Sequence, residues 1–352
     1  MRLLYNARNA SVGTEDGMIV EPTGSFDLVI DLPAADVRPG LINAHDHLHR
    51  NHYGRLGEPP YRNAAQWAQH IQRRYRRRIA RRHRWPRRAA LLAGAWKNLF
   101  AGVTTVVHHD RWETDFDRDF PIRVAGIPSA DSVRASTELD RIQTDRPSCI
   151  HVAEGTDPDS ADEVRNLHDR GLLTSRLIAV HGVGCDDDGI ARLRASGAAL
   201  AWCPTSNLFM LGRTAAPTLL RSGIDILLGS DSLLSGEGDL LCELRFARAQ
   251  GVLDDGLLEE AVGDAPARRL GLPLPSLRPG AAADLIFVRK PILEAGAEDV
   301  DLVVVEGAPR VARVDLVPRL GAIGESGEQM KVGSVLRWAN MRPARFMKGR
   351  PA

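Results

Sequence analysis

Cysteine is scarce in this chain of 352 residues, and long apolar runs and phosphate-binding glycine motifs are absent. Its four cysteines stand among apolar neighbours and none forms a C-x-x-C pair, so we expect buried thiols with neither a disulfide nor a metal. No apolar run is long enough to cross a membrane and no secretory signal opens the chain, which favours a soluble cytoplasmic protein. No G-x-G-x-x-G or G-x-x-x-x-G-K-S/T stretch opens a helix, so dinucleotide and P-loop sites have no support.

Lysine is also scarce, because only four of the 46 basic residues are lysines: Lys97, Lys290, Lys331 and Lys348. The rest of the composition, with 43% hydrophobic residues, 26% charged residues and a net charge of +1, is that of an ordinary globular chain. A chain of this length can bury a large core. Any chemistry that needs a lysine, however, has few candidates.

Both ends of the chain carry short strand-like runs separated by Gly, Pro and Asn turn signals. The first forty residues contain LLYNA, GMIV and FDLVIDL, and the far end contains ADLIFV (283–288) and DLVVVEG (301–307). Each end alone offers too few strands for a stable sheet. We therefore predict that the two ends pair into one small sheet domain.

Between these ends, short apolar runs alternate with longer amphipathic stretches, which predicts a parallel sheet with crossover helices. An open doubly wound sheet concentrates its site at one switch point, whereas a barrel collects side chains from many strand ends at one mouth. Polar side chains end six of the apolar runs: His45 and His47, His108 to Asp110, His151 and Glu154, His181, Ser206 and Asn207, Ser230 and Asp231. Six contributing strands favour a (β/α)8-type TIM barrel.

An H-x-H motif at His45 and His47 follows one of these apolar runs. Residues i and i+2 of an extended chain project to the same side, so these two imidazoles can bind one ion. His151, His181 and Asp231 each end a further run, where a barrel strand would deliver them to the same mouth. Imidazole nitrogens with a carboxylate suit Zn²⁺ or Fe²⁺ and leave a position for an activated water. The whole pattern predicts a metal site.

Seven ordered stretches resemble the amidohydrolase superfamily, and within it the branch of chlorohydrolases and purine or pyrimidine deaminases. They are PGLINAHDH (39–47), HVAEG (151–155), VHGVGCDDDGI (180–190), AWCPTSNLFM (201–210), LLGSDS (227–232), ELRFA (243–247) and LRPGAAADLIFV (277–288). The resemblance spans most of residues 30–305. It implies a TIM barrel at residues 39–276 and a small β-sandwich domain built from residues 1–38 and 277–352.

The resemblance also implies that four residues hold one divalent metal ion: His45, His47, His151 and Asp231. Glu154 corresponds to the glutamate of the family's H-x-x-E motif, and His181 to the histidine of the next strand. We expect Asp231 to accept a proton from the water as well, and His181 to orient the hydroxide. Glu154 would protonate the ring or amide nitrogen and then the leaving group. The alternatives are a surface or helix-capping carboxylate for Glu154, and for His181 either a fifth metal ligand or a buried structural histidine.

Two features depart from the family pattern. Residues 111–148 hold one good strand candidate, IRVAGIP, where the family has two, so we predict that one barrel strand is short, distorted or missing. The stretch after His181 lacks the second histidine that many relatives have three positions on.

The number of ions is predicted from lysine. Binuclear relatives bridge their ions with a carboxylated lysine on a central strand. Lys97 is the only lysine in the relevant region, and its surroundings, GAWKNLF, predict a helix. One ion is therefore expected, with Zn²⁺ favoured and Fe²⁺ as the alternative.

Loops after barrel strands line the mouth, so the residues beside the metal motifs are candidates for substrate contact: His49, Arg50, Asn51, His52, His109 and Ser232. The alternative for these residues is loop packing or support of the ligands.

Ten arginines crowd residues 73–88, which superficially suggests nucleic-acid binding. Apolar side chains at helical spacing instead predict one amphipathic helix with a solvated basic face. The expected partner is a small-molecule substrate, without nucleic acid or membrane, and a homo-oligomer is compatible with the sequence.

The sequence thus favours an enzyme that hydrolyses a C–N bond other than a peptide bond, foremost the deamination of an amino-heterocycle by a metal-bound hydroxide. Hydrolysis of a cyclic amide and dechlorination use the same parts and stay open. A third interpretation, from a different class, is a catalytically silent metal-binding or scaffold relative. The intact set of site residues argues against it, because a desolvated charged cluster without a purpose would be lost.

Overall fold

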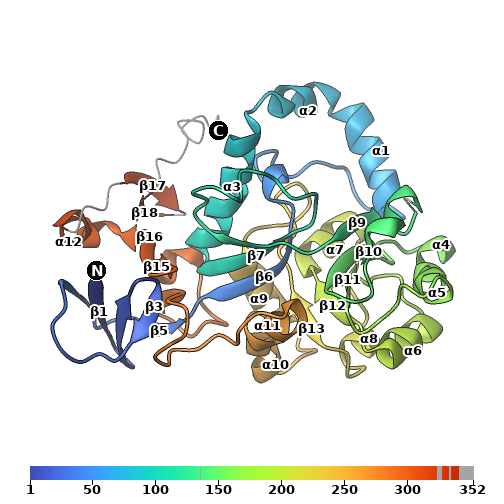
Figure 1. Ribbon diagram of the computed structural model, residues 1–352. Helices are drawn as coiled ribbons and strands as arrows, with labels where there is room; N and C mark the ends of the chain where they lie inside the picture. Colours follow the sequence, from blue (N-terminus) through green and yellow to red (C-terminus); the bar gives the residue numbers. More distant parts are fainter. Residues whose placement is uncertain (135, 323–326, 333, 341–352) are drawn as a thin grey trace.

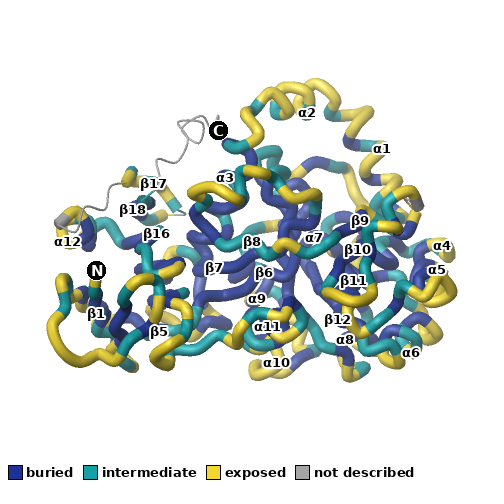
Figure 2. The backbone as a smooth tube through the Cα atoms, viewed as in Figure 1, coloured by how far each residue is buried: buried dark blue, intermediate teal, exposed yellow. Residues whose placement is uncertain are grey.

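The computed structural model describes residues 1–134, 136–322, 327–332 and 334–340. Figure 1 shows parallel strands with helices around them, and beside them a β-rich part built from residues 1–39 and from described residues after 284. Burial follows this arrangement, because the strands are buried whereas helices α1 (Ala64–Arg74) and α2 (Arg76–His83) are mostly exposed (Figure 2). The predicted α/β class is confirmed.

Eight strands form two parallel sheets in the middle of the chain. The first sheet, in the order β6-β7-β8, comprises β6 (Leu41–Asp46), β7 (Val103–His108) and β8 (Arg123–Ala125). The second, in the order β13-β12-β11-β10-β9, comprises β9 (Ser129–Ser132), β10 (Ser148–Val152), β11 (Leu177–His181), β12 (Ala199–Trp202) and β13 (Ile226–Leu228). Strands β6, β7, β10, β11 and β12 are buried along their whole length, which explains their continuous apolar sequences.

The two sheets meet at residues 123–132, where β8 pairs with β7 and β9 pairs with β10. Residues 126–128 separate these two short strands, and Pro128 among them has no N–H to continue a ladder. The segment at residues 123–132 thus fills one strand position with two short strands, β8 and β9. This agrees with the prediction of a distorted strand. Among the described strands no ladder joins β6 to β13, so the expected barrel is not closed by strand pairing there. The physical reason is that β13 ends at Leu228, before the chain comes alongside His45 of β6.

Helices fill the connections between the strands. The link from β6 to β7 contains η1 (Leu48–Arg50), α1, α2 and α3 (Arg87–Phe100). The predicted single arginine-rich helix over residues 73–88 is in fact divided among α1, α2 and the start of α3, and α1 and α2 meet at Tyr75 because its backbone leaves the helical region. The later helices are η2 (Ser136–Arg141), α4 (Pro158–Ala161), α5 (Glu163–Asp169), α6 (Asp187–Ser196), α7 (Pro204–Leu211), α8 (Pro217–Leu220), α9 (Leu240–Ala249), α10 (Asp255–Glu260) and α11 (Asp264–Leu270).

The chain ends form two further sheets. The first, in the order β3-β2-β1-β4, comprises β1 (Arg2–Ala7), β2 (Ser11–Glu15), β3 (Met18–Val20) and β4 (Leu28–Leu32). The second, in the order β17-β18-β16-β15-β14-β5, comprises β5 (Asp36–Pro39), β14 (Leu285–Val288), β15 (Val300–Val305), β16 (Ala308–Arg313), β17 (Glu328–Val332) and β18 (Val335–Ala339). Short helices η3 (Ala297–Asp299), η4 (Val314–Leu316) and α12 (Val317–Ala322) connect them.

The two terminal sheets share apolar contacts. The rings of Tyr5 and Phe287, both fully buried, lie 5.2 Å apart, and β5 pairs antiparallel with β14. The two ends therefore do pack together, while a β-sandwich domain at residues 1–38 and 277–352 stays a prediction. Residues 341–352 of that prediction lie outside the described residues.

Candidate metal and active site

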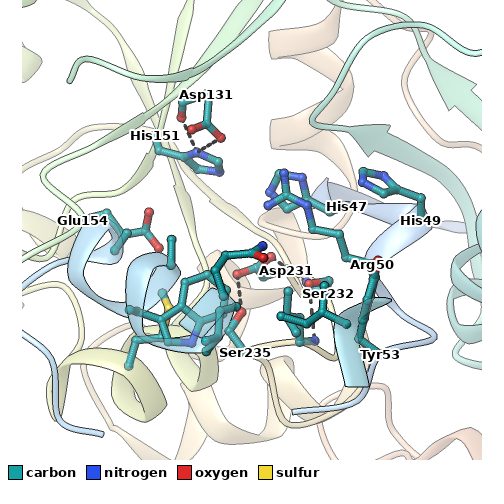
Figure 3. Close-up of a pocket in the computed structure, with 18 of the residues that line it drawn as sticks. His47, His49, Arg50, Tyr53, Asp131, His151, Glu154, Asp231, Ser232 and Ser235 are labelled. Atoms are coloured by element: carbon teal, nitrogen blue, oxygen red, sulfur yellow. Dashed lines mark hydrogen bonds and ion pairs between the residues drawn. The ribbon is translucent and has the colours of Figure 1, made fainter. Parts of the chain in front are cut away.

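The carboxyl ends of the parallel strands bring the predicted ligands together. The ring of His45 lies 5.0 Å from that of His47, 5.1 Å from that of His151 and 5.6 Å from that of His181. Its Nε2 atom lies 3.9 Å from Oδ1 of Asp231. Asp231 stands three residues after Leu228, the last residue of β13. Figure 3 shows the side chains of His47, His151 and Asp231 around one opening. The structure thus gathers residues that are up to 186 positions apart in the chain.

His45 is the centre of this cluster. Both of its ring nitrogens are buried without a hydrogen-bond partner among the described residues. Potential ligand atoms of His45, His151 and His181 lie within 4.8 Å of one another, and so do those of His45, His47 and Asp231. Buried polar atoms without partners are costly, and a metal ion shared by these two groups would give one of the His45 nitrogens a partner. The donor set of imidazoles and one carboxylate therefore fits a divalent transition metal.

Two of the histidines are held by hydrogen bonds through their outer ring nitrogens. Nδ1 of His47 lies 2.8 Å from Oδ2 of Asp110, and Nδ1 of His151 contacts the backbone oxygen of Asp131. Such contacts fix the tautomer and orientation of a ligating imidazole and leave Nε2 for the metal. Burial lowers the pKa of His45, His47 and His151 well below the ordinary value, because a protonated ring would be desolvated and would add charge next to other imidazoles and, for His45 and His47, next to Arg50. These rings are therefore neutral at neutral pH, which is the form that binds metal.

The carboxylate of Asp231 is held in place by three donors. Oδ2 accepts hydrogen bonds from the hydroxyls of Ser206 at 2.7 Å and Ser235 at 2.9 Å, while Oδ1 accepts from the N–H of Ser232 at 2.6 Å. The backbone of Asp231 has a φ of +48°, in the left-handed region that a non-glycine residue rarely adopts. The local turn thus aims this carboxylate at the histidines.

Glu154 and His181 lie side by side in the site. Oε1 of Glu154 lies 3.3 Å from Nε2 of His181, whose Nδ1 lies 2.7 Å from the side-chain oxygen of Asn207. Burial raises the pKa of Glu154 well above its ordinary value, and the neighbouring carboxylates of Asp231 and Asp131 raise it further. Burial also lowers the pKa of His181. A protonated carboxyl group therefore lies beside an unprotonated imidazole nitrogen.

A cavity of about 660 Å³ opens over these residues. Of the predicted substrate contacts, His49, Arg50, His52 and Ser232 line it. Apolar side chains from α1, α2, α7 and the loop after β13 also line it: Trp67, Ile71, Ile79, Met210 and Leu234. Residues of both α1 and α2 thus line the cavity, so the arginine-rich segment borders the site rather than a remote surface.

The other two predicted contacts, Asn51 and His109, are not among the lining residues. The amide of Asn51 donates to Asp46 at 2.9 Å, and its oxygen accepts from the N–H of Leu233 at 3.0 Å. His109 stacks on His151 with ring centroids 4.0 Å apart, and its Nε2 lies 2.8 Å from a backbone oxygen. Both side chains support the site from outside the cavity.

Sequence analysis missed Asp131 and Ser235 and gave Asp110 and Ser206 no definite role at the site. Asp110 directly follows two histidines at a strand end, which is a detectable signal. For Asp131 and Ser235 we find no local signal, because their contacts join segments that are distant or irregular.

Within the described ranges, no helix is long and apolar enough to cross a membrane.

Comparisons with known proteins identify similar chains. Residues 150–310 match the model of the Amidohydrolase family. A 5-methylthioadenosine/S-adenosylhomocysteine deaminase of Nitratidesulfovibrio vulgaris is 34% identical over 222 residues, which are 54% of this chain and 48% of that protein. An aminodeoxyfutalosine deaminase of Deinococcus radiodurans is 36% identical over 120 residues, which are 33% of this chain and 29% of that protein. The matched part is less than half the length of each of these curated relatives.

Solved structures resemble the chain over almost its whole length. An adenosine deaminase from Xanthomonas campestris with bound zinc has a TM-score of 0.64 at 19% identity, covering 91% of this chain and 96% of that one. An atrazine chlorohydrolase from Arthrobacter aurescens complexed with zinc has a TM-score of 0.67 at 18% identity, covering 92% and 99%. At this identity the likeness shows the fold alone.

Proposed function

This chain belongs to the amidohydrolase superfamily, and we propose on that premise that it is a metal-dependent hydrolase that removes an amino group from a heterocycle. The observation that carries the proposal is the His45 ring, whose two buried nitrogens have no partner among the described residues and lie beside three further imidazoles and a carboxylate. The names of the curated relatives as deaminases favour deamination over hydrolysis of a cyclic amide or dechlorination.

Four residues would hold the ion: His45, His47, His151 and Asp231. A divalent metal at this position supplies Lewis-acid chemistry and lowers the pKa of water towards neutrality. Zinc is favoured over iron because the structural neighbours named above contain zinc. One ion is favoured over two because the amino group of Lys97, the only candidate for a bridging lysine, donates to Asp46 instead.

The remaining roles belong to residues of the chain itself. Asp231 accepts a proton from the attacking water, and its two serine partners keep the carboxylate oriented. Glu154 donates its proton to a ring nitrogen of the substrate, takes up the proton of the hydroxyl group that has been added to the carbon, and passes it to the departing amino group; the proton held by Asp231 then restores Glu154. Nε2 of His181, 3.3 Å from Oε1 of Glu154, orients the attacking water by accepting a hydrogen bond. Water adds to the carbon that bears the amino group, and ammonia leaves.

The cavity sets the size of the substrate. A volume of about 660 Å³ holds a heterocycle together with a sugar or side chain of similar size. Arg50, His52 and Ser232 supply polar contacts near the reacting end, while the apolar wall next to α1 takes the remainder.

Ammonia release tests the proposal. Zinc-loaded protein is incubated with a panel of adenosine derivatives, cytosine, guanine and amino-triazines, and ammonia is measured together with the ultraviolet spectrum of the heterocycle. We expect release from at least one amino-heterocycle, and none from Asp231→Asn. Chloride or ring-opened product without ammonia would favour the related hydrolytic reactions. Inactivity on the whole panel, with zinc fully bound, would support a catalytically silent relative.

A further inference from the structure

The strands that carry the ligands at the two edges of the site lack a connecting ladder. β6 presents His45 and His47, and Asp231 follows β13, yet among the described residues these strands are not paired in one sheet. A few bonds cross the junction instead. The N–H of Asp231 donates to the backbone oxygen of His45 at 3.0 Å, and that of Ser230 donates to the side chain of Asn43 at 3.1 Å. Other groups must therefore help to set the distance between the two strands.

Lys97 reaches this junction from α3. Its Nζ atom lies 2.9 Å from Oδ2 of Asp46, 2.9 Å from Oγ of Ser230 and 2.7 Å from the backbone oxygen of Asp231. A lysine ammonium has three N–H donors, so all three have acceptors here. The first acceptor belongs to β6 and the other two follow β13. The side chain of Lys97 is 8% exposed and that of Asp46 is fully buried, so the contact is shielded from water.

The close approach of α3 is built into the sequence. A Cβ atom on Gly94, one turn before Lys97, would lie 2.4 Å from the backbone oxygen of Leu48, so only glycine fits there. Asn98 follows Lys97 and donates to Oδ2 of Asp46 at 2.7 Å. The helix thus presents two adjacent donors to one carboxylate, which the amide of Asn51 also contacts through its other oxygen.

Asp46 stands between His45 and His47 in the H-x-H motif. Successive side chains of a strand point to opposite faces, so fixing the carboxylate on the outer face fixes both imidazoles on the inner face. In the same way, the hydrogen bond from Lys97 to the backbone oxygen of Asp231 fixes the chain that follows β13. The φ of Asp231 is +48°. The Lys97 ammonium therefore contacts the backbone of one proposed ligand, Asp231. It also contacts Asp46, which is the chain neighbour of two others, His45 and His47.

We propose that Lys97 is a positioning residue for the metal site, which clamps the first and last strands together and sets the separation of His45 and His47 from Asp231. The inference rests on the proposed metal-binding function. It assigns to this lysine a role different from a carboxylated bridging ligand, because Nζ has three oxygen acceptors within 2.9 Å on the outer face of β6. The competing interpretation is a buried ion pair that stabilises the fold and leaves the ligands unaffected.

Cobalt binding separates these two interpretations, because the visible spectrum of Co²⁺ reports the geometry of its ligands. Apoprotein of the wild type and of Lys97→Met is titrated with Co²⁺ against a competing chelator. We expect Lys97→Met to bind Co²⁺ about 10–100-fold more weakly, with a shifted absorption spectrum. The variant Lys97→Arg, which keeps the charge, should recover part of the affinity.

Two further variants protect the test from simple misfolding. Lys97→Met combined with Asp46→Asn leaves no unpaired buried charge, so it should fold and still show the altered cobalt spectrum. Arg337→Met is the matched control, because it removes a buried cation of β18 that contacts Asp301 in the terminal sheet, and it should leave cobalt binding unchanged. Unaltered Co²⁺ affinity and an unaltered Co²⁺ spectrum in Lys97→Met and in Lys97→Met combined with Asp46→Asn would overturn the clamp. Failure of the wild type itself to bind Co²⁺ or Zn²⁺ would overturn the metal site and the clamp together.

Discussion

Nε2 of His181 lies 3.3 Å from Oε1 of Glu154. Because Nδ1 of the same ring donates to the side-chain oxygen of Asn207, the neutral imidazole has a lone pair on Nε2 and can only accept from the carboxyl group. The proton therefore belongs to Glu154, in agreement with a pKa that burial raises well above the ordinary value. This pair distinguishes an acid-base catalyst from a protein that only holds a metal.

Replacement of Glu154 tests this distinction. Glu154→Gln keeps the shape of the side chain but has no proton to give to the leaving amino group. We expect kcat to fall by about 10²–10⁴-fold while the metal content and the KM change little. Steady-state kinetics on a confirmed substrate and elemental analysis of the same sample provide the measurement. Activity within about threefold of the wild type would assign the proton transfer to another group, and loss of metal would make Glu154 structural.

The ligand set predicts the metal content. Purified protein should contain about one equivalent of zinc or iron per chain, since one carboxylate and three imidazoles fill most of a single coordination sphere. His45→Ala and Asp231→Ala should abolish loading, whereas His168→Ala, at an exposed histidine, should not. Inductively coupled plasma mass spectrometry measures all four proteins. Unchanged metal in both ligand variants would refute the assignment.

Asp110 should contribute to metal affinity without touching the metal. Its Oδ2 accepts a hydrogen bond from Nδ1 of His47, which orients the ring. Asp110→Asn keeps the size but offers a weaker, neutral partner, so we expect the affinity for Zn²⁺ to fall by about 10–100-fold. Chelator competition measures the dissociation constant, with Asp117→Asn at the nearby surface as the control. Equal affinities in the two variants would show that the contact is incidental.

Glu243 on α9 should make stability depend on pH. Burial raises its pKa to about 8 in the folded protein, from an ordinary value of 4.5. Below 4.5 both folded and unfolded chains hold the proton, whereas from 4.5 to about 8 only the folded chain does. In that window the folded form binds the extra proton, so the contribution of Glu243 falls by about 1.4 kcal/mol for each unit of rising pH.

Glu243→Gln removes this titration and still accepts the hydrogen bond that the N–H of Thr205 donates at 2.9 Å. Urea unfolding near pH 5 and pH 8 measures the effect. The free energy of unfolding of the wild type should decline more steeply with pH than that of the variant. Parallel pH profiles would mean that Glu243 ionises normally in the folded protein.

The shared packing of the chain ends predicts the result of a truncation. Removal of residues 1–32 deletes Tyr5 and exposes the buried ring of Phe287. The strands β14 to β18 should then be digested faster by a protease, while residues 39–276 resist digestion longer. Mass spectrometry of the fragments identifies the cleavage sites. Equal resistance of the C-terminal strands in the two proteins would argue against one composite domain.

The sequence by itself determined which chemistry is present and where along the chain it lies. Alternation of apolar runs with amphipathic stretches predicted the α/β class, and the polar ends of those runs predicted His45, His47, His151, His181 and Asp231. The structure brings these five side chains together because strand periodicity is local: residues two apart share a face, and the ends of parallel strands share one edge.

Only the tertiary structure decided how these groups are held. The bond from His47 to Asp110 joins residues 63 apart, and that from Lys97 to the Asp231 backbone joins residues 134 apart, so no local pattern specifies them. The same holds for the segment divided between β8 and β9, which depends on the two strands available to pair with it. Local sequence encodes the side of a strand on which a side chain lies, whereas the partner of that side chain depends on packing between distant segments.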